Sequence, residues 1–477
     1  MQGDLKVNGL ERDTLKDQLE YALLPNGINQ QEQFLPICSL RSICNEIAVL
    51  TELSRYFDSE QAKQYTRYVY DQSKPAKKIF SVLALINRIE LTPTFRDAGF
   101  LDQDLPLTKN TGGLELRSRC PQDQRSITLA RSPQNVKKIC DFSLKQWCVH
   151  IPSFEMDGNG SYEGLVLESG TIMPWESAGQ NIITGGYGYV QKIKIHKDHH
   201  SFIVALKTIL PAKEKTRDVF KQELVAFRKV LPGPNLVQLV SAFEISGKDQ
   251  YMLLFPWAEG GSMNDLMNQL PKDLFTSLQL SPRDFVQWII SQCRGLVEAF
   301  GAIHQANIVP RMNEGTSSGE ARSFGIHLDI KPANILCFSQ ETASHPLGVL
   351  KIADFGLTRF HSQSSRTRKS RGSAYRCSQQ YRSPEHDIGY IISRKVDIWA
   401  LGCIFSEHFT WMLLEHKARE RFRQAGMQDA LFSGDWDYIE NSFENDIEDN
   451  FFQRHIEIIG GNRGASVPYM ASRIRQR

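Results

Sequence analysis

The stretch FGIHLDIKPANIL, residues 324–336, places an acid, a base and an amide within six positions, between apolar flanks. Asp329 can accept a proton from a hydroxyl group, Lys331 can stabilise charge developing on a phosphate, and Asn334 can offer its amide oxygen to a metal ion. Leu328 stands directly before the acid. The pattern predicts a loop held between core segments, with polar side chains that carry chemistry.

Two other segments supply matching chemistry. LKIADFGL presents Asp354 at the end of an apolar strand, where its carboxylate could hold Mg²⁺. VALK places Lys207 on another apolar strand, and a lysine there requires an anionic partner. Glu223 lies on the inward side of an amphipathic helix expected over residues 216–231. A Lys–Glu pair that holds the phosphates of a nucleotide accounts for both residues.

A glycine-rich turn precedes this lysine. Gly185, Gly186 and Gly188 lie between two strand-like runs. Without a Cβ atom, their backbone N–H groups could approach a phosphate closely. Such a hairpin is often only a turn, so the functional interpretation depends on Lys207 following it on the next strand.

The composition is that of an ordinary globular protein, and it narrows the functional classes. The chain has 477 residues, 41% hydrophobic and 23% charged, with a net charge of +2. This balance gives no reason to expect nucleic acid or a membrane surface as a partner, and the apolar runs are too short to cross a bilayer. The first residues lack a secretory signal core. Nine scattered cysteines predict reduced thiols in an intracellular protein, cytoplasmic with the nucleus left open.

A histidine cluster allows two interpretations. In HKDHH, His196, His199 and His200 could bind a metal ion or form a polar turn between strands. No cysteine or further histidine accompanies them, which favours the turn.

These parts, in this order, resemble the catalytic domain of eukaryotic serine/threonine protein kinases. The glycine loop, the strand lysine, the helix glutamate, the HLDIKPAN loop, the DFG triplet and QYRSPE all follow in series between about 176 and 411. The resemblance implies an α+β, bilobal fold, with a small antiparallel sheet in the N-lobe (176–257) and a mainly helical C-lobe (258–411). Filamentous-fungal kinase-like proteins with a helical N-terminal extension look similar.

The resemblance also assigns roles, with ATP and Mg²⁺ as cofactors. It implies four catalytic residues: Asp329, Lys331, Lys207 and Glu223. It implies two metal ligands: Asn334 and Asp354. It implies nine residues around the nucleotide: Gly185, Gly186, Gly188, Val190, Ala205, Lys207, the gatekeeper Phe255, the hinge residue Ala258, and Leu336. It places four residues on the family's regulatory stack: His327, Phe355, Phe227 and Asp397.

The implied activity is transfer of the ATP γ-phosphate to Ser or Thr hydroxyls of a protein substrate. Lys331, two residues after Asp329, follows the serine/threonine pattern, and Ser378 stands where such kinases carry a threonine. One alternative is a pseudokinase, a nucleotide-binding scaffold or interaction protein. Another alternative is a small-molecule kinase, because those enzymes share the pattern of the HLDIKPAN loop. They usually lack the DFG triplet and the Ser383-Pro384-Glu385 triplet, and this chain has both.

The chain departs from the family pattern at four places. Ile183 replaces the first glycine of the loop, and Leu328 replaces an arginine that usually pairs with a phosphate on the activation segment. Phosphorylation of that segment should therefore matter less. About twenty extra residues after His304 suggest a surface insertion. The C-terminal end, 412–477, is atypical or truncated and shows no recognisable partner for Glu385.

The N-terminal third carries no recognisable chemistry. Residues 1–33 are expected to lack regular structure, and residues 34–170 form an accessory, mostly helical region. This region could be an extension that packs on the main domain or a module that binds a partner, and the sequence leaves both open.

Overall fold

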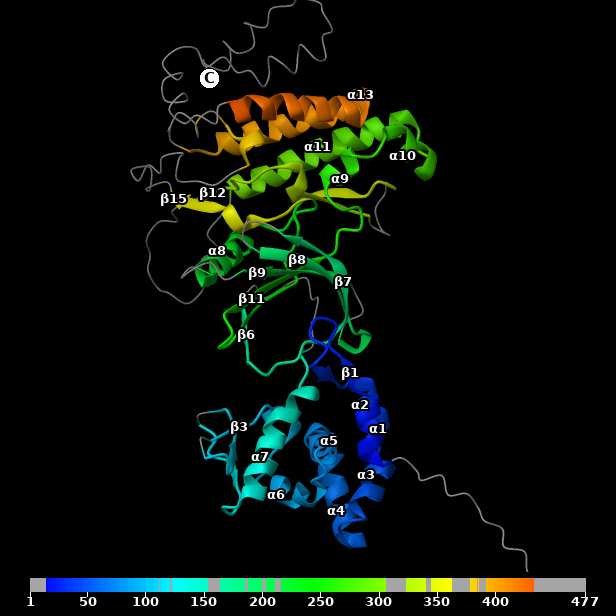
Figure 1. Cartoon of the computed structure of the whole chain (residues 1–477), viewed down its shortest axis with the longest axis vertical. Helices are drawn as coiled ribbons and strands as arrows, with labels where there is room; N and C mark the ends of the chain where they lie inside the picture. The colour runs from blue at the N-terminus through cyan, green and yellow to red at the C-terminus, as the bar shows by residue number, and fades with distance from the viewer. Residues whose placement is uncertain are drawn as a thin grey trace, which may run out of the picture. The chain divides into compact units, whose positions relative to one another are not determined.

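The structure is a computed structural model (Figure 1). It describes residues 14–110, 112–120, 122–152, 164–184, 188–199, 203–210, 216–305, 323–339, 345–362, 378–383, 385 and 392–432. The chain forms two compact units: Met1–Pro211 with Val240–Leu254, and Ala212–Leu239 with Phe255–Arg477. The insertion expected after His304 lies outside the described residues.

The first unit begins with a helical region that has its own hydrophobic core. Its helices are α1 (Leu15–Tyr21), α2 (Ile37–Ile43), α3 (Glu46–Leu53), α4 (Ser59–Val69), α5 (Lys77–Leu85), α6 (Thr92–Asp97) and α7 (Pro133–Lys145). Its short strands are β1 (Leu24–Pro25), β2 (Gln33–Phe34), β3 (Thr108–Lys109), β4 (Glu115–Arg117) and β5 (Ser126–Thr128). Helix α5 lies at the centre of this core, because every residue from Ile79 to Leu85 is buried.

Residues 14–33 differ from the expectation of no regular structure. Thr14 caps helix α1 reciprocally with Asp17, which satisfies backbone N–H groups at the start of the helix. Leu15 and Leu19 are buried in the helical core, and β1 pairs with β2. A seven-residue helix offers only these two inward apolar positions, so its periodicity is too short to distinguish from loop sequence.

The first unit also contains a curved six-stranded sheet, ordered β6-β10-β11-β9-β8-β7. Its strands are β6 (Leu165–Leu167), β7 (Trp175–Thr184), β8 (Gly188–Ile195), β9 (Ile203–Ile209), β10 (Ser241–Ile245) and β11 (Gln250–Pro256). Strand β10 pairs antiparallel with β11, β8 pairs antiparallel with both β7 and β9, and β6 pairs parallel with β10. The expected antiparallel sheet around the glycines is therefore present, with β6 added from the preceding region.

The helical region is attached to the edge of this sheet by specific contacts within the first unit. The Gly27 N–H donates to the Trp175 carbonyl at 2.7 Å, and Asn26 Nδ2 donates to the Met173 carbonyl at 2.8 Å. A Cβ atom on Gly27 would lie 2.8 Å from the Ser177 backbone, so this approach requires glycine. The Cys38 N–H donates to Asp198 Oδ2 at 2.8 Å. These contacts favour an extension that packs on the sheet.

The histidine cluster takes part in the same attachment. Phe34 meets the rings of His196 and His199 edge-on, with centroids 5.8 and 6.4 Å away. Burial lowers the pKa of His199 to about 4, so its ring is neutral near pH 7. The described residues contain no group of three His, Cys, Asp or Glu side chains able to hold a metal ion. The described part of the cluster is a buried aromatic contact.

The second unit is mainly helical. Its helices are α8 (Thr216–Lys229), α9 (Met263–Met267), α10 (Pro271–Leu278), α11 (Pro282–His304) and α13 (Lys395–Phe432). Two strand pairs accompany them: β12 (Ser323–Ile326) with β15 (Arg359–Ser362), and β13 (Ile335–Phe338) with β14 (Val349–Ile352). Together with the sheet of the first unit, these elements make up the expected α+β kinase-like fold. In the described parts of the chain, no helix is long and apolar enough to span a membrane.

Helix α13 is two helices joined at Glu415, whose φ of 65° and ψ of 177° are not helical. Arg419 Nε lies 3.1 Å from Glu407 Oε2. In a straight helix, twelve residues would separate these positions by about 18 Å. The chain therefore doubles back after Glu415, and the segment that the sequence marks as atypical contributes a buried side chain to this unit.

The buried His408 predicts acid sensitivity. Its ring stacks on Trp411 at 5.6 Å, and burial lowers the pKa of His408 to about 3, with the charge of Arg419 adding to the effect. Below pH 6.5 the unfolded chain takes up a proton that the folded chain does not, so stability falls as the pH falls from 6.5 towards 3.

The variant His408→Phe should weaken that dependence. Between pH 7 and 5, the parent should lose about 2 kcal/mol more than the variant from its free energy of unfolding, measured in urea by tryptophan fluorescence. Equal losses in the two proteins would show that His408 does not resist protonation.

Candidate active site

The backbone of the loop that follows β12 is fixed by hydrogen bonds to one carboxylate. Asp397, in the first turn of α13, accepts the His327 N–H at 2.8 Å through Oδ2 and the Leu328 N–H at 3.0 Å through Oδ1. His304 Nε2 also lies 2.9 Å from Oδ2. Asp397 is only 1% exposed. The loop backbone is thus fixed before its polar side chains begin.

Leu328 adopts a conformation that its residue type disfavours. Its φ is +71°, in the left-handed region, which costs a residue with a Cβ about 1–2 kcal/mol. The two bonds to Asp397 and the burial of the side chain against Ile326 and Val396 hold it there. A buried leucine cannot replace an arginine as a ligand for phosphate, so the structure gives this departure a packing role.

Three polar side chains converge on Asp329. Lys331 Nζ lies 2.9 Å from Asp329 Oδ2, and Ser378 Oγ donates to Asp329 Oδ1 at 3.1 Å. Lys331 also donates to Ser378 Oγ at 3.2 Å. Asn334 Nδ2 donates both to the Asp329 carbonyl at 2.8 Å and to Oδ2 at 2.9 Å. The structure therefore brings together three residues of one loop and a serine 49 positions later.

Asn334 and Asp354 could supply oxygen ligands to a metal ion. The Asn334 amide nitrogen donates both hydrogen bonds to Asp329, which leaves the amide oxygen for another partner. The Ala353 N–H donates to the Asn334 carbonyl at 2.8 Å, so the end of β14 lies beside the loop. Asp354 follows, with φ +61° and Oδ1 accepting the Gly356 N–H at 3.3 Å. Mg²⁺ is commonly held by one or two such oxygens plus substrate phosphates, so this donor set fits it.

A stack of aromatic rings runs behind the loop within the second unit. The centroids of His327 and Phe355 are 5.2 Å apart, those of Phe355 and Phe227 are 4.9 Å apart, and Phe227 meets Phe255 at 5.4 Å. Burial lowers the pKa of His327. These contacts connect α8, the DFG triplet and the loop, and His327 links the stack to Asp397 through its backbone N–H.

Helix α8 also contacts the DFG segment through a residue that the sequence did not single out. Gln222 Nε2 donates to the carbonyls of Gly356 and Thr358 at 2.9 and 3.2 Å. Its neighbour Glu223 is 1% exposed. No motif marks this glutamine, because its partners are backbone atoms more than 130 positions away.

The other residues assigned to the nucleotide are divided between the units. In the first unit, Val190 on β8 pairs with Lys207 on β9, and Ala205 lies two residues earlier on that strand. A Cβ atom on Gly188 would collide with the Thr208 carbonyl oxygen, so this position requires glycine. Gly185 and Gly186 lie outside the described residues. Ile183, at the position of the missing first glycine, is exposed on β7.

In the second unit, the assigned apolar residues share one cluster. Ala258 is buried in it, and Phe255 and Leu336 pack against it. The Gly260 N–H donates to the Cys337 carbonyl at 3.0 Å, which fixes the segment after the expected hinge against β13. The predicted positions of Phe255, Ala258 and Leu336 are therefore neighbours in space.

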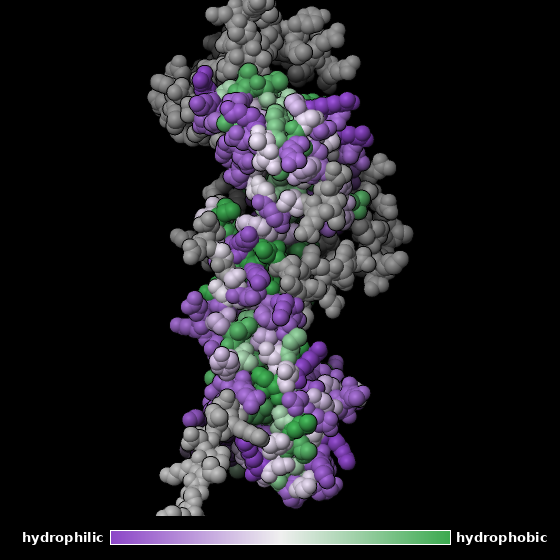
Figure 2. Space-filling view, turned by 90° about the vertical axis from the view of Figure 1, so that its right-hand side faces the viewer, coloured by the Kyte–Doolittle hydropathy of each residue, from purple (hydrophilic) through white to green (hydrophobic). Residues whose placement is uncertain are grey.

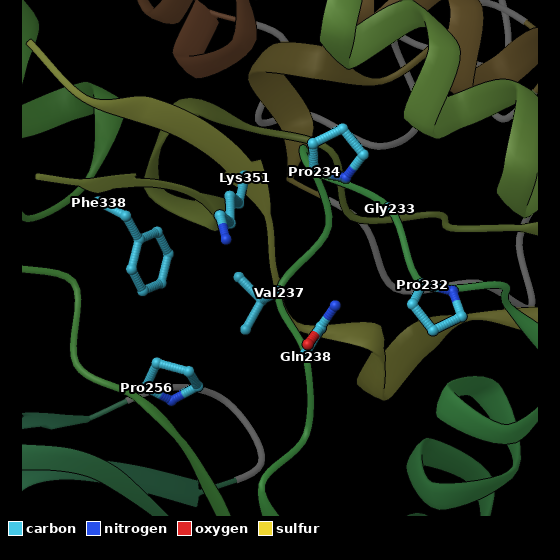
Figure 3. Close-up of a pocket in the computed structure, with 8 residues that line it drawn as sticks. All are labelled: Pro232, Gly233, Pro234, Val237, Gln238, Pro256, Phe338 and Lys351. Atoms are coloured by element: carbon cyan, nitrogen blue, oxygen red, sulfur yellow. The ribbon is translucent and has the colours of Figure 1, made fainter. Parts of the chain in front are cut away.

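A separate cavity of about 350 Å³ lies in the second unit (Figure 3). Its lining residues are Pro232, Gly233, Pro234, Val237, Gln238, Pro256, Phe338 and Lys351. The Lys351 amine lies 5.1 Å from the Phe338 ring centroid, and burial lowers the pKa of Lys351. None of the polar loop residues lines this cavity, so it is distinct from the group around Asp329.

The buried group around Arg419 was missed by the sequence analysis. Besides Glu407, Arg419 contacts Asn264 Oδ1 at 2.6 Å and Asn268 Oδ1 at 3.1 Å. The Tyr381 hydroxyl donates to Glu407 at 2.7 Å. The sequence shows no recognisable arginine partner for Glu385, and in the structure Arg419 pairs with Glu407.

Comparison with known proteins identifies the class. Residues 177–452, more than half of the chain, match the family model described as protein kinase domain. The chain belongs to the protein kinase domain family.

Individual relatives are more distant. The chain is 30% identical over 225 residues to cyclin-dependent kinase-like 5 of Mus musculus, covering 47% of this chain and 19% of the relative. It is 26% identical over 242 residues to the G2-specific protein kinase nimA of Emericella nidulans, covering 48% and 31%. With myosin light chain kinase family member 4 of Homo sapiens it shares 24% over 291 residues, 61% of each. The chain thus spans less than two thirds of each of these relatives.

Proposed function

We propose that this protein is an ATP- and Mg²⁺-dependent kinase that phosphorylates Ser or Thr residues of protein substrates. The observation that carries the proposal is the contact set of Asp329, Lys331, Asn334 and Ser378, in which a carboxylate, an ammonium group, an amide and a hydroxyl lie within hydrogen-bond distance. Phosphoryl transfer depends mainly on such positioned charges.

Each side chain has a role that its contacts support. Asp329 would orient the acceptor hydroxyl and take its proton, while Lys331, beside it, would stabilise the charge on the transferring group. Asn334 and Asp354 would hold Mg²⁺, which supplies further charge stabilisation when bound. Lys207 and Glu223 would act on the nucleotide phosphates, as the family pattern implies.

The choice of Ser or Thr as acceptor is supported by two observations. Lys331 bridges Asp329 and Ser378, as the serine/threonine pattern requires. One relative, 25% identical over 292 residues, is described as a probable serine/threonine-protein kinase of Dictyostelium discoideum. Phosphoamino-acid analysis of the product tests this choice, and phosphotyrosine as the main product would contradict it.

The activity itself can be tested by autophosphorylation and by transfer to a generic basic protein substrate. The full chain with Mg²⁺ and radiolabelled ATP should incorporate phosphate, and Asp354→Ala should not. A Mg²⁺-dependent rise in Tm with ATP, without transfer under any condition, would identify a pseudokinase instead.

Leu328 gives a prediction about regulation. Because this side chain is buried and cannot bind a phosphate on the activation segment, phosphatase treatment should leave the transfer rate within about twofold of the untreated rate. The measurement is the initial rate before and after treatment, with the phosphatase removed. A large loss that returns on autophosphorylation would show that another cation replaces the missing arginine.

We also propose that residues 34–170 form an accessory region carried by the first unit, with 1–33 contributing α1 and β1 to it. Its hydrophobic core, from Leu15 to Ile172, is separate from the core of the sheet. The contacts of Gly27 and Phe34 with the sheet edge suit an extension that could present a surface to a protein partner. Residues 1–175 expressed alone test independence: an unfolded product would exclude a self-standing module.

A further inference from the structure

The cavity beside Lys351 has the size of a small-molecule site, and its lining includes none of the side chains around Asp329. Its volume is about 350 Å³, and ligand sites commonly measure about 300–1,000 Å³. On the face shown in the space-filling view, apolar residues reach the surface in several patches with polar residues between them (Figure 2). Exposed apolar residues are common on soluble proteins. A hollow that joins apolar walls to a charged group is a more specific sign of a ligand.

The walls of the cavity are mostly apolar and rigid. Val237 and Phe338 are buried and belong to one apolar cluster. Three prolines line the cavity with them: Pro232, Pro234 and Pro256. A proline side chain loses almost no conformational freedom when another group packs against it. These walls therefore suit a rigid apolar ring.

Lys351 is the one charged side chain among the lining residues that the structure describes. Its amine points into the space between Phe338 and Val237 (Figure 3) and lies 5.1 Å from the Phe338 ring centroid. Within the described part of the chain, no carboxylate pairs with this amine. Burial lowers the pKa of Lys351. A half-buried ammonium group without a counter-ion favours an anionic ligand, because the anion offsets the loss of hydration.

The donors around the cavity indicate the kind of anion. Besides Lys351, Gln238 is the one other described lining residue whose side chain carries N–H groups. One ammonium group and one amide can satisfy a single carboxylate. A phosphate monoester has three acceptor oxygens and a charge of about −1.5 to −2, so it requires more donors. The donor set therefore matches a carboxylate.

Backbone hydrogen bonds hold the walls in place without a ligand. The Val237 N–H donates to the Ile352 carbonyl at 2.9 Å, and the Ile352 N–H donates to the Asn235 carbonyl at 2.8 Å. Asn235 Nδ2 also donates to the Leu350 carbonyl at 2.7 Å. The loop that carries two of the prolines is thus fixed to β14, the strand that carries Lys351. A preformed cavity costs a ligand less free energy for ordering the protein.

We propose that this cavity binds a small organic acid with one carboxylate and a rigid apolar ring. The carboxylate pairs with Lys351, Gln238 supplies a second donor, and the ring packs against Phe338 and the prolines. All the lining residues named belong to the second unit. The inference concerns a site apart from Asp329 and holds whether or not the chain transfers phosphate.

A saturation-transfer NMR titration of the full chain with cinnamate tests the site. The expected Kd is about 1 mM or lower. Lys351→Met should raise Kd at least about tenfold, because methionine fills similar space without the charge. Lys229→Met is the matched control and should leave Kd unchanged. Lys229 is also half-buried, and its amine lies 4.9 Å from the ring centroid of Phe360, outside the cavity lining.

Equal affinity of the parent and Lys351→Met for cinnamate would overturn the proposal, as would a Kd of the parent above about 10 mM. Loss of binding in Lys207→Met, with Lys351→Met unaffected, would also overturn it, because the probe would then occupy the site assigned to the nucleotide.

Two further probes keep the test independent of the folding of any variant. Cinnamamide has the same ring without the charge, and acetate has the charge without the ring. Each should bind the parent protein at least about tenfold more weakly than cinnamate. If cinnamamide binds as tightly as cinnamate, the cavity selects only for apolar surface and the proposed pairing with Lys351 is wrong. If acetate does, the ring has no site there and the proposal also fails.

Discussion

Asp329→Asn should reduce kcat for phosphoryl transfer by at least about 10³-fold, within the range expected for loss of a general base. An asparagine cannot accept the proton of the acceptor hydroxyl at neutral pH. It also loses the charge that Lys331 contacts at 2.9 Å. The fold should survive, because the loop is held through the backbone N–H groups of His327 and Leu328. The measurements are steady-state transfer rates and Tm.

The control is Asp273→Asn, an exposed carboxylate on α10 that makes the same chemical change away from the loop. It should leave kcat unchanged. Lys207→Met should also abolish transfer if the family role of that lysine holds. Should Asp329→Asn retain the parental rate with both metal and ATP saturating, the assignment of Asp329 as the base would be refuted.

Arg419→Met should lower the free energy of unfolding of the second unit by about 3–5 kcal/mol. Arg419 is 1% exposed and Glu407 is 0% exposed, so the substitution leaves a buried carboxylate without its ionic partner. The asparagines at 264 and 268 also lose a donor. Urea unfolding followed by the fluorescence of the buried Trp411 reports this loss.

Arg421→Met, two residues further on, is the matched control, because Arg421 is exposed and should change stability by less than about 0.5 kcal/mol. Adding Glu407→Gln to Arg419→Met removes the unpaired charge and should recover part of the loss. If Arg419→Met is as stable as the parent, the doubling back of α13 at Glu415 is not held by this ion pair.

The candidate catalytic group could be predicted from sequence because its geometry is mostly local. Asp329, Lys331 and Asn334 lie within six positions, and a loop of that length confines their side chains to one region. Asp354 could be placed because it ends an apolar strand, which β14 confirms. The antiparallel sheet was also predictable, because strand-like runs separated by a short glycine-containing segment indicate a β-hairpin.

The parts that sequence analysis missed depend on contacts between distant residues. Arg419 carries no motif, and a plain helix would place it about 18 Å from Glu407. Only the break at Glu415, where φ is 65°, brings them together. Helix α1 was missed because its two buried leucines belong to the core around α5. Helix α5 lies about sixty residues later in the sequence.

By itself, then, the sequence determined the family, the α+β class and the order of the chemical groups, because these follow from spacing along the chain and from the types of residue. The tertiary structure decided what Leu328 does, where Arg419 finds its partner and which side chains of the first helix of α13 are buried. Those outcomes depend on burial and on a single backbone angle. Burial is a property of all the surrounding segments together, so no local stretch of sequence specifies it.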